Sequence, residues 1–161
     1  MSDRTLQIEQ LAEKLLRHRI KVAVAESCTG GMLAQEFTSL AGSSMWFECG
    51  FVSYSNASKI MSLGVNSDVI SEHGAVSKEV AELMAIGVLK NSQANLSASI
   101  TGIAGPGGGT AEKPLGTVFI STAFENDKTK TVKHLFDGDR HRVRDQSVEQ
   151  AIMQLSERLS G

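Results

Sequence analysis

The chain has 161 residues, of which 41% are hydrophobic and 21% are charged, and its formal net charge is −2. This length predicts one domain over residues 1–161, and the small negative charge argues against a basic surface for nucleic acid or an anionic membrane. No apolar run approaches the roughly 20 residues of a membrane span, and residues 1–10 are polar, so we expect a cytoplasmic protein. Cys28 and Cys49 fit neither a disulfide framework nor a zinc-ligand spacing, so we expect reduced thiols.

Helix-like and strand-like patterns alternate along the chain. Apolar residues at helical spacing predict helices at 5–19, 32–42, 56–62 (with Asn56 as the cap), 67–73 and 77–89. A last helix is predicted after residues 137–139, with its apolar positions between 148 and 159. Short β-branched, aromatic or alternating segments predict strands at 21–25, 46–55, 96–100, 115–123 and 130–136. Helices between strands favour parallel pairing, and a polar turn joins the last two strands. We therefore expect a single-domain α/β/α sandwich with a mixed, mostly parallel sheet and a late antiparallel hairpin.

Small polar residues gather at 25–31, 41–44 and 54–59, where predicted strands or helices begin or end. Ligands in open α/β sheets bind at the carboxyl ends of the strands. Ser27, Tyr54 and Thr101 all lie at such ends in the predicted order of elements. These three positions therefore predict a common site.

The hydroxyl groups near Lys59 suggest a serine nucleophile with an amine as its base, because a serine hydroxyl is inert until a neighbour takes its proton. Serine and threonine also cap helices and fill turns, so the hydroxyls alone do not establish catalysis. Ser55 has i,i+4 spacing to Lys59, and Ser44 could instead approach the lysine through the fold. The spacing leaves both possibilities open.

The segment 101–109 contains five glycines, but it opens no helix and ends in no Gly-Lys-Ser/Thr, so it is neither a dinucleotide fingerprint nor a phosphate loop of nucleotide hydrolases. Backbone amides in such a loop can still turn toward an anion, and a plain flexible turn is the alternative.

Three arginines, Arg140, Arg142 and Arg144, stand at the start of the last predicted helix, where a phosphate would be favoured. The alternative is a solvated basic turn balanced by neighbouring aspartates. His73, His134 and His141 share no ligand spacing, so no metal site is expected.

Several motifs, taken together and in order, resemble the C-terminal domain family of the competence/damage-inducible protein CinA. They are Ala25-Glu26-Ser27-Cys28-Thr29-Gly30-Gly31, Ala41-Gly42-Ser43-Ser44, Tyr54-Ser55-Asn56 with Lys59, His73-Gly74-Ala75-Val76-Ser77, Thr101-Gly102-Ile103-Ala104-Gly105-Pro106 and Lys113-Pro114-Leu115-Gly116-Thr117-Val118. The resemblance covers nearly the whole chain. It implies a nicotinamide-nucleotide amidase, which converts nicotinamide mononucleotide to nicotinate mononucleotide and ammonia in pyridine-nucleotide recycling.

The resemblance also implies a serine–lysine mechanism, with Ser44 as nucleophile, Lys59 as base, Tyr54 as an orienting or relaying hydroxyl and Ser27 as the rival nucleophile. The substrate contacts expected are Thr29, Gly30, Thr101, Gly102, Gly105, Arg140 and Arg144. No metal and no cofactor are expected, the expected partner is the nucleotide substrate, and the chain is expected to form a homo-oligomer. The competing interpretation is a nucleotide-binding or interaction module that kept the fold without useful amidase activity.

Overall fold

The structure is a computed structural model and describes residues 2–159. Its helices are α1 (Asp3–Arg17), α2 (Met32–Thr38), α3 (Asn56–Leu63), α4 (Ser67–His73), α5 (Lys78–Lys90) and α6 (Arg140–Arg158), with one 3-10 turn, η1 (Ser43–Met45). Its strands are β1 (Val22–Glu26), β2 (Phe47–Val52), β3 (Leu96–Gly102), β4 (Thr117–Phe124) and β5 (Lys130–Leu135). Every predicted element is present, and most of the boundaries differ by a few residues. α6 begins at Arg140, directly after residues 137–139, where the arginine cluster placed the start of the last predicted helix.

The five strands form one sheet in the order β2-β1-β3-β4-β5. β1 runs parallel to both β2 and β3, whereas β4 is antiparallel to both β3 and β5. The predicted mixed sheet and late hairpin are therefore confirmed, with parallel and antiparallel pairings present in equal number.

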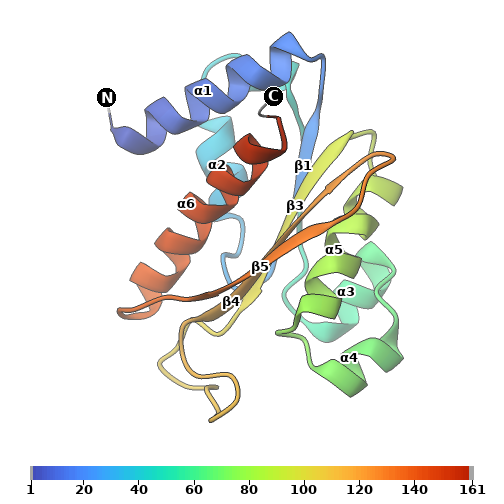
Figure 1. Cartoon of the computed structure of the whole chain (residues 1–161), viewed down its shortest axis with the longest axis vertical. Helices are drawn as coiled ribbons and strands as arrows, with labels where there is room; N and C mark the ends of the chain where they lie inside the picture. Colours follow the sequence, from blue (N-terminus) through green and yellow to red (C-terminus); the bar gives the residue numbers. More distant parts are fainter. Residues whose placement is uncertain (1, 160–161) are drawn as a thin grey trace.

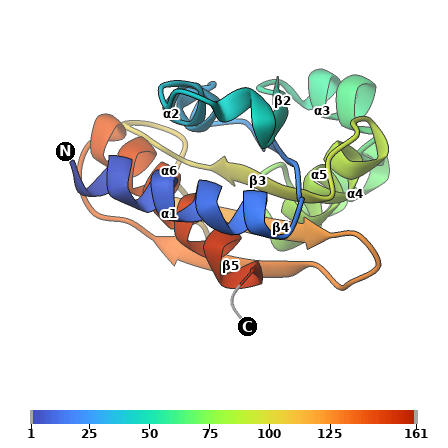
Figure 2. The same cartoon turned by 90° about the horizontal axis from the view of Figure 1, so that it is seen from above.

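The sheet lies between two layers of helices, with α1, α2 and α6 on one face and α3, α4 and α5 on the other (Figures 1 and 2). β1 shows why both faces are covered, because all five of its residues are buried. Val22 and Val24 belong to the core on the α6 side, whereas Ala23 and Ala25 belong to the core on the α5 side. This alternation is the two-residue period of a strand.

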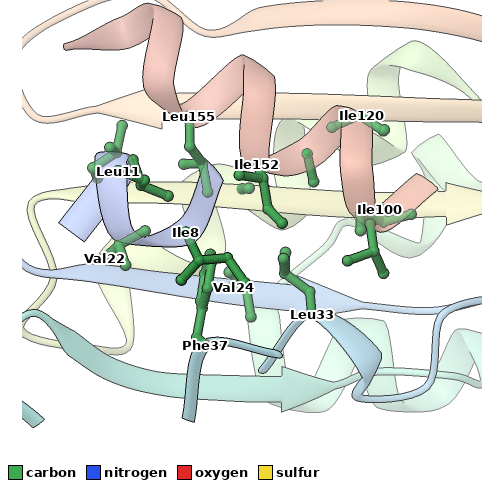
Figure 3. Close-up of a cluster of buried hydrophobic side chains, with 14 of the residues drawn as sticks. Ile8, Leu11, Val22, Val24, Leu33, Phe37, Ile100, Ile120, Ile152 and Leu155 are labelled. Carbon is green, nitrogen blue, oxygen red and sulfur yellow. The ribbon is translucent and has the colours of Figure 1, made fainter. Parts of the chain in front are cut away.

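The larger core lies on the α6 side. Apolar side chains from the helices meet apolar side chains from the strands there (Figure 3): Ile8, Leu11, Leu33, Phe37, Ile152 and Leu155 from helices, and Val22, Val24, Ile100 and Ile120 from strands. Full burial of such a side chain is worth about 1.5–3 kcal/mol, so this cluster fixes the helices against the sheet. The strand ends therefore have a rigid base.

A serine caps the start of helix α3, which carries Lys59. The Ser55 hydroxyl accepts a hydrogen bond from the Ser58 amide at 3.0 Å, which is the geometry of a helix N-cap. The prediction that Asn56 is the cap was therefore wrong by one residue. Asn56 lies in the first turn of α3 instead, and its side chain does not carry the cap.

Because β1, β2 and β3 are parallel, their carboxyl ends meet at one edge of the sheet. The first turn of α6 and the connection between β3 and β4 lie at this same edge, at the bottom of Figure 1. None of the helices in the described part of the chain is both long and apolar enough to cross a membrane.

Candidate active site

Lys59 is the central residue of the carboxyl edge of the sheet. Its side chain projects from α3 and is only 1% exposed. The amine Nζ lies 3.0 Å from Ser27 Oγ, 3.0 Å from the carbonyl oxygen of Ser53 and 2.9 Å from that of Tyr54. A serine hydroxyl and two backbone carbonyls therefore surround the amine.

Burial lowers the pKa of the Lys59 amine, because desolvation penalises its charged form, and the nearby Cys28 side chain opposes this with a smaller effect. No ion pair with a carboxylate is found for Lys59 among the described residues. The two carbonyls can only accept hydrogen bonds. A neutral amine would donate its two N–H groups to them, and its lone pair would then face the Ser27 hydroxyl.

Ser27 comes directly after β1 and is 8% exposed. Its amide donates to the Ile100 carbonyl of β3 at 3.0 Å, and its own carbonyl accepts from the Gly30 amide at 3.1 Å. Ser27 Oγ also lies 3.4 Å from the Tyr54 carbonyl, which is longer than its contact with Lys59. Lys59 Nζ thus donates to Ser27 Oγ, and the Ser27 hydroxyl donates to the Tyr54 carbonyl. Loss of a proton from the amine would let its lone pair accept the Ser27 hydroxyl instead.

The turn 27–31 reverses the chain between β1 and α2. Gly30 and Gly31 have φ angles of 57° and 105°, the left-handed region that glycine adopts without strain. The buried Glu26 carboxylate accepts hydrogen bonds from the Leu33 amide at 2.9 Å and the Ala34 amide at 3.1 Å. A charged acceptor thus binds two amides of the first turn of α2, which fixes that helix to the end of the strand that positions Ser27.

A cavity of about 210 Å³ opens over this pair. Its lining residues come from the three strand ends, α3, the segment before α5 and the start of α6: Ser27, Cys28, Tyr54, Asn56, Lys59, Ala75, Val76, Thr101, Gly102, Ala104 and Arg140. A larger cavity, of about 660 Å³, lies between the end of α5 and the β4–β5 hairpin. The smaller cavity is the candidate active site, because it holds the serine–lysine pair.

The two arginines predicted to contact substrate have different surroundings, although both lie on α6. Arg140 lines the cavity and donates to the Gly105 carbonyl at 2.8 Å and to the Tyr54 hydroxyl at 3.4 Å. Arg144 donates instead to the carbonyls of Cys28 and Thr29, at 3.0 and 3.2 Å. Arg140 is therefore the arginine that faces the cavity.

Tyr54 contributes to the site through two different groups. Its backbone carbonyl accepts from Lys59, whereas its side chain is 60% exposed and has its hydroxyl next to Arg140. The structure therefore brings the phenol to the rim of the cavity. Within residues 2–159 the phenol makes no hydrogen bond to Ser27 or Lys59, so its position does not support the expected relay.

Ser44 does not join this group. It is an exposed residue of η1, which precedes β2, and the Trp46 carbonyl after it accepts from Val22 at the start of β1. Ser44 thus lies near the amino ends of the parallel strands, whereas Ser27 lies at their carboxyl ends. The strands separate these ends by about 15 Å. The expectation that Ser44 approaches Lys59 was wrong, because the direction of β2 carries the two residues apart.

Two other residues predicted to contact substrate, Thr101 and Gly102, line the cavity but also have structural roles. Thr101 lines the cavity, but its hydroxyl donates to the Ala75 carbonyl at 2.9 Å, just as Ser97 and Ser99 donate to carbonyls of α5. Gly102 also lines the cavity, and a Cβ there would lie 2.6 Å from Val118 Cγ2, so packing within the sheet explains this glycine. The Thr101 hydroxyl and the glycine at 102 are therefore used by the fold.

Thr29, Gly30 and Gly105 support the cavity from outside its lining. Thr29 is fully buried and its carbonyl accepts from Arg144, Gly30 shapes the turn after Ser27, and the Gly105 carbonyl holds Arg140. Burial also raises the pKa of the Cys28 thiol to about 11, so this cavity residue is a neutral thiol at physiological pH.

Sequence reasoning missed several lining groups. The lining residues Cys28, Asn56, Ala75, Val76 and Ala104 were not predicted as site residues, and neither was the Ser53 carbonyl that accepts from Lys59. Ala75, Val76 and Ala104 belong to motifs used for the family resemblance, which was the available signal. The Ser53 carbonyl had no signal, because any residue type supplies a backbone oxygen. In the part of the chain that the structure describes, no three His, Cys, Asp or Glu side chains cluster to hold a metal ion.

Fold and site together define an α/β protein whose buried serine–lysine pair is suited to acyl transfer. The chain belongs to the CinA C-terminal domain family, because the family model matches residues 5–159. It is 46% identical over 147 residues to the nicotinamide-nucleotide amidohydrolase PncC of Escherichia coli strain K12, covering 91% of this chain and 89% of that protein.

Two further relatives show the range of the family. A CinA-like protein of Chlorobium chlorochromatii is 53% identical over 117 residues, which are 73% of this chain but 28% of that protein. The crystal structure of the competence/damage inducible protein CihA from Agrobacterium tumefaciens matches with a TM-score of 0.94 and 37% identity, covering 98% of this chain and 96% of that one. The domain thus occurs both alone and within longer chains.

Proposed function

We propose that this chain is a nicotinamide-nucleotide amidohydrolase, which converts nicotinamide mononucleotide to nicotinate mononucleotide and ammonia in pyridine-nucleotide recycling. The observation that carries the proposal is the 3.0 Å contact between the buried Lys59 amine and Ser27 Oγ inside a cavity. The identity to the Escherichia coli enzyme over nearly the full length of both chains supports the substrate.

Ser27 is the nucleophile and Lys59 the base in this proposal. The Lys59 lone pair takes the Ser27 hydroxyl proton while Oγ bonds to the carboxamide carbon, and the carbonyl electron pair moves to the oxygen. The carbonyls of Ser53 and Tyr54 hold the neutral amine in the orientation that this transfer needs. A pyridinium cation nearby would lower the pKa of Lys59 further.

The tetrahedral intermediate then collapses. The C–N bond breaks, and the Lys59 ammonium returns its proton to the departing nitrogen, so ammonia leaves and the acyl group stays on Ser27. Water attacks the ester carbon and gives a proton to Lys59, and the Ser27–acyl bond breaks to release the nicotinate product. Ser27 is reprotonated from Lys59, which restores the starting state.

Arg140 is the proposed phosphate contact. The cavity of about 210 Å³ is smaller than the roughly 300–1,000 Å³ that holds a whole drug-sized ligand, so it suits the nicotinamide ring and leaves ribose and phosphate at its mouth. Arg140 and the Tyr54 phenol lie at this mouth. Asn56, which also lines the cavity, can donate to and accept from the ribose hydroxyls.

The direct test is ammonia release by the purified chain. We expect release from nicotinamide mononucleotide in the presence of a chelator, with much lower efficiency on free nicotinamide, which lacks the phosphate that Arg140 would bind. Binding of the nucleotide without ammonia release would favour the competing interpretation of a binding module. Equal catalytic efficiency on nicotinamide mononucleotide and on free nicotinamide would contradict the proposed phosphate contact of Arg140.

Cytoplasmic location and self-association are further parts of the proposal. Both rest on the sequence and its family resemblance. Cell fractionation tests the first, and light scattering of the purified chain tests the second, with a mass equal to that of one chain contradicting the homo-oligomer.

A further inference from the structure

We infer that Arg144 is a positioning residue that holds the turn carrying Ser27, and that it does not bind the substrate phosphate. This inference rests on the proposed function for the meaning of Ser27. It divides the basic cluster at the start of α6 between two tasks, one for Arg140 and one for Arg144.

The contacts of Arg144 all point to the turn 27–31. Its Nε donates to the Cys28 carbonyl at 3.0 Å and its Nη2 to the Thr29 carbonyl at 3.2 Å. A planar guanidinium that donates hydrogen bonds to two successive carbonyls fixes the orientation of both peptide groups. A lysine ammonium, which acts as a single point charge, does not fix them in this way. These peptide groups begin one residue after Ser27, so fixing their orientation restricts where Oγ lies relative to Lys59.

The packing around Arg144 supports the same role. The side chain is partly buried, and a Cβ at Gly30 would lie 3.5 Å from Nη2, so the guanidinium packs closely against the turn. Arg144 does not line the cavity, whereas Arg140, one helical turn earlier, does. A substrate phosphate held by Arg144 would have to compete with two carbonyls already in place.

The opposite side of the turn is fixed independently. The Ser27 amide donates to Ile100 of β3, and the Glu26 carboxylate holds the first turn of α2. Arg144 adds the attachment to α6, a third element. Its loss should therefore move the turn locally and leave the sheet and the helices in place.

The test compares Arg144→Ala with Arg140→Ala and with Arg142→Ala, an exposed arginine of the same helix that serves as the charge-matched control. Two readouts are used: steady-state hydrolysis of nicotinamide mononucleotide, and the rate at which a fluorophosphonate probe labels Ser27. The second needs no physiological substrate, so failure of the proposed function would not hide the result for Arg144.

We expect Arg144→Ala to lower kcat and the labelling rate by about 10- to 100-fold with KM nearly unchanged, because a small misplacement of a nucleophile has effects of this size. Millimolar guanidinium should partly restore both rates, whereas equal sodium chloride should not. Arg144→Lys should stay impaired, and it keeps the test valid if the alanine variant does not fold. Arg140→Ala should raise KM and leave labelling unchanged.

A raised KM for Arg144→Ala with normal kcat and labelling would overturn the inference and make Arg144 a substrate contact. Unchanged values of all three quantities would show that Arg144 only packs against the turn. Loss of rate without any rescue by guanidinium, together with a melting temperature lowered far below that of Arg142→Ala, would assign the effect to general destabilisation.

Discussion

The turn after β1 and the turn before β2 have similar residues but lie at opposite ends of the parallel strands. Residues 27–31 and 41–44 both combine serines with glycines of positive φ. The first turn lies where three parallel strands end, and its Ser27 is buried against Lys59. The second lies where two of those strands begin, and its Ser44 is exposed. The comparison teaches that the direction of the strand decides which serine can meet the base.

Replacing each of the two serines by alanine tests this comparison most directly. Ser27→Ala should lower kcat by about 10³-fold or more, because the nucleophile is lost, whereas Ser44→Ala should stay within about twofold of the unsubstituted chain. Ammonia release from nicotinamide mononucleotide measures both. Loss of activity in Ser44→Ala with retention in Ser27→Ala would reverse the assignment.

Lys59→Met should be nearly as inactive as Ser27→Ala, and the double variant should be no worse than either, since nucleophile and base act as a unit. The same change should lower stability by about 1–3 kcal/mol, because the buried carbonyls of Ser53 and Tyr54 lose their donor. Activity and urea unfolding measure the two effects. Additive losses of activity would contradict the pairing of Lys59 with Ser27.

The pH dependence sharpens the role of Lys59. Burial puts its pKa in the folded chain below the ordinary value of 10.5, and the proposed base must be neutral. The rate constant kcat/KM should therefore fall as pH drops below this lowered pKa and level off above it. A profile with no such limb would contradict a lysine base.

The same pKa predicts how stability changes with pH. Between the lowered pKa and 10.5, the unfolded chain holds the Lys59 proton and the folded chain does not. The free energy of unfolding should therefore rise with pH across this window. Unfolding curves of the unsubstituted chain and of Lys59→Met should differ in this slope, and equal slopes would argue against the lowered pKa.

Arg140→Ala tests the mouth of the cavity. Loss of a phosphate contact that is equally strong in substrate and transition state should raise KM for the nucleotide by about 10-fold with little change in kcat. Hydrolysis of free nicotinamide should be affected much less. An equal loss on both amides would remove the phosphate role of Arg140.

Among the substitutions of cavity residues, Tyr54→Phe should have the smallest effect, a change in kcat of about fivefold or less. The group that contacts Lys59 is the backbone carbonyl of Tyr54, which the substitution keeps, whereas the lost hydroxyl lies beside Arg140 at the rim. Steady-state kinetics measures this. A loss of 10³-fold would restore the relay that the family resemblance suggested for the phenol.

The fold was predictable because hydrophobic periodicity and turn residues are local signals. The segments that became β1 and α5 carry their pattern within the segment itself, and the alternation of helix and strand is typical of a parallel arrangement. The start of α6 was placed from the arginines that follow Asp137-Gly138-Asp139, because residues 140–147 are mostly polar and carry no apolar stripe. Hydrophobic periodicity alone does not locate the start of a helix whose first turns are polar.

The sequence predicted which residues belong to the site better than it predicted which of them contact one another. Ser27, Lys59 and Arg140 were all named, but the choice of Ser44 as nucleophile required knowing which end of β2 faces Lys59. That depends on pairing between β1 and β2, which is a long-range property. The division between Arg140 and Arg144 has the same origin, because Arg140 contacts Gly105, 35 residues away, and Arg144 contacts Cys28, 116 residues away.

The most direct measurement is to locate the acyl group after acid quenching of the chain with nicotinamide mononucleotide. Trypsin leaves Ser27 and Ser44 in one peptide, 22–59, because no lysine or arginine separates them, whereas cleavage after Glu26, Glu36 and Glu48 puts them in peptides 27–36 and 37–48. The nicotinoyl-nucleotide adduct should appear on 27–36, at Ser27, and be absent in Ser27→Ala. An adduct on 37–48, at Ser44, would contradict the assignment of the nucleophile.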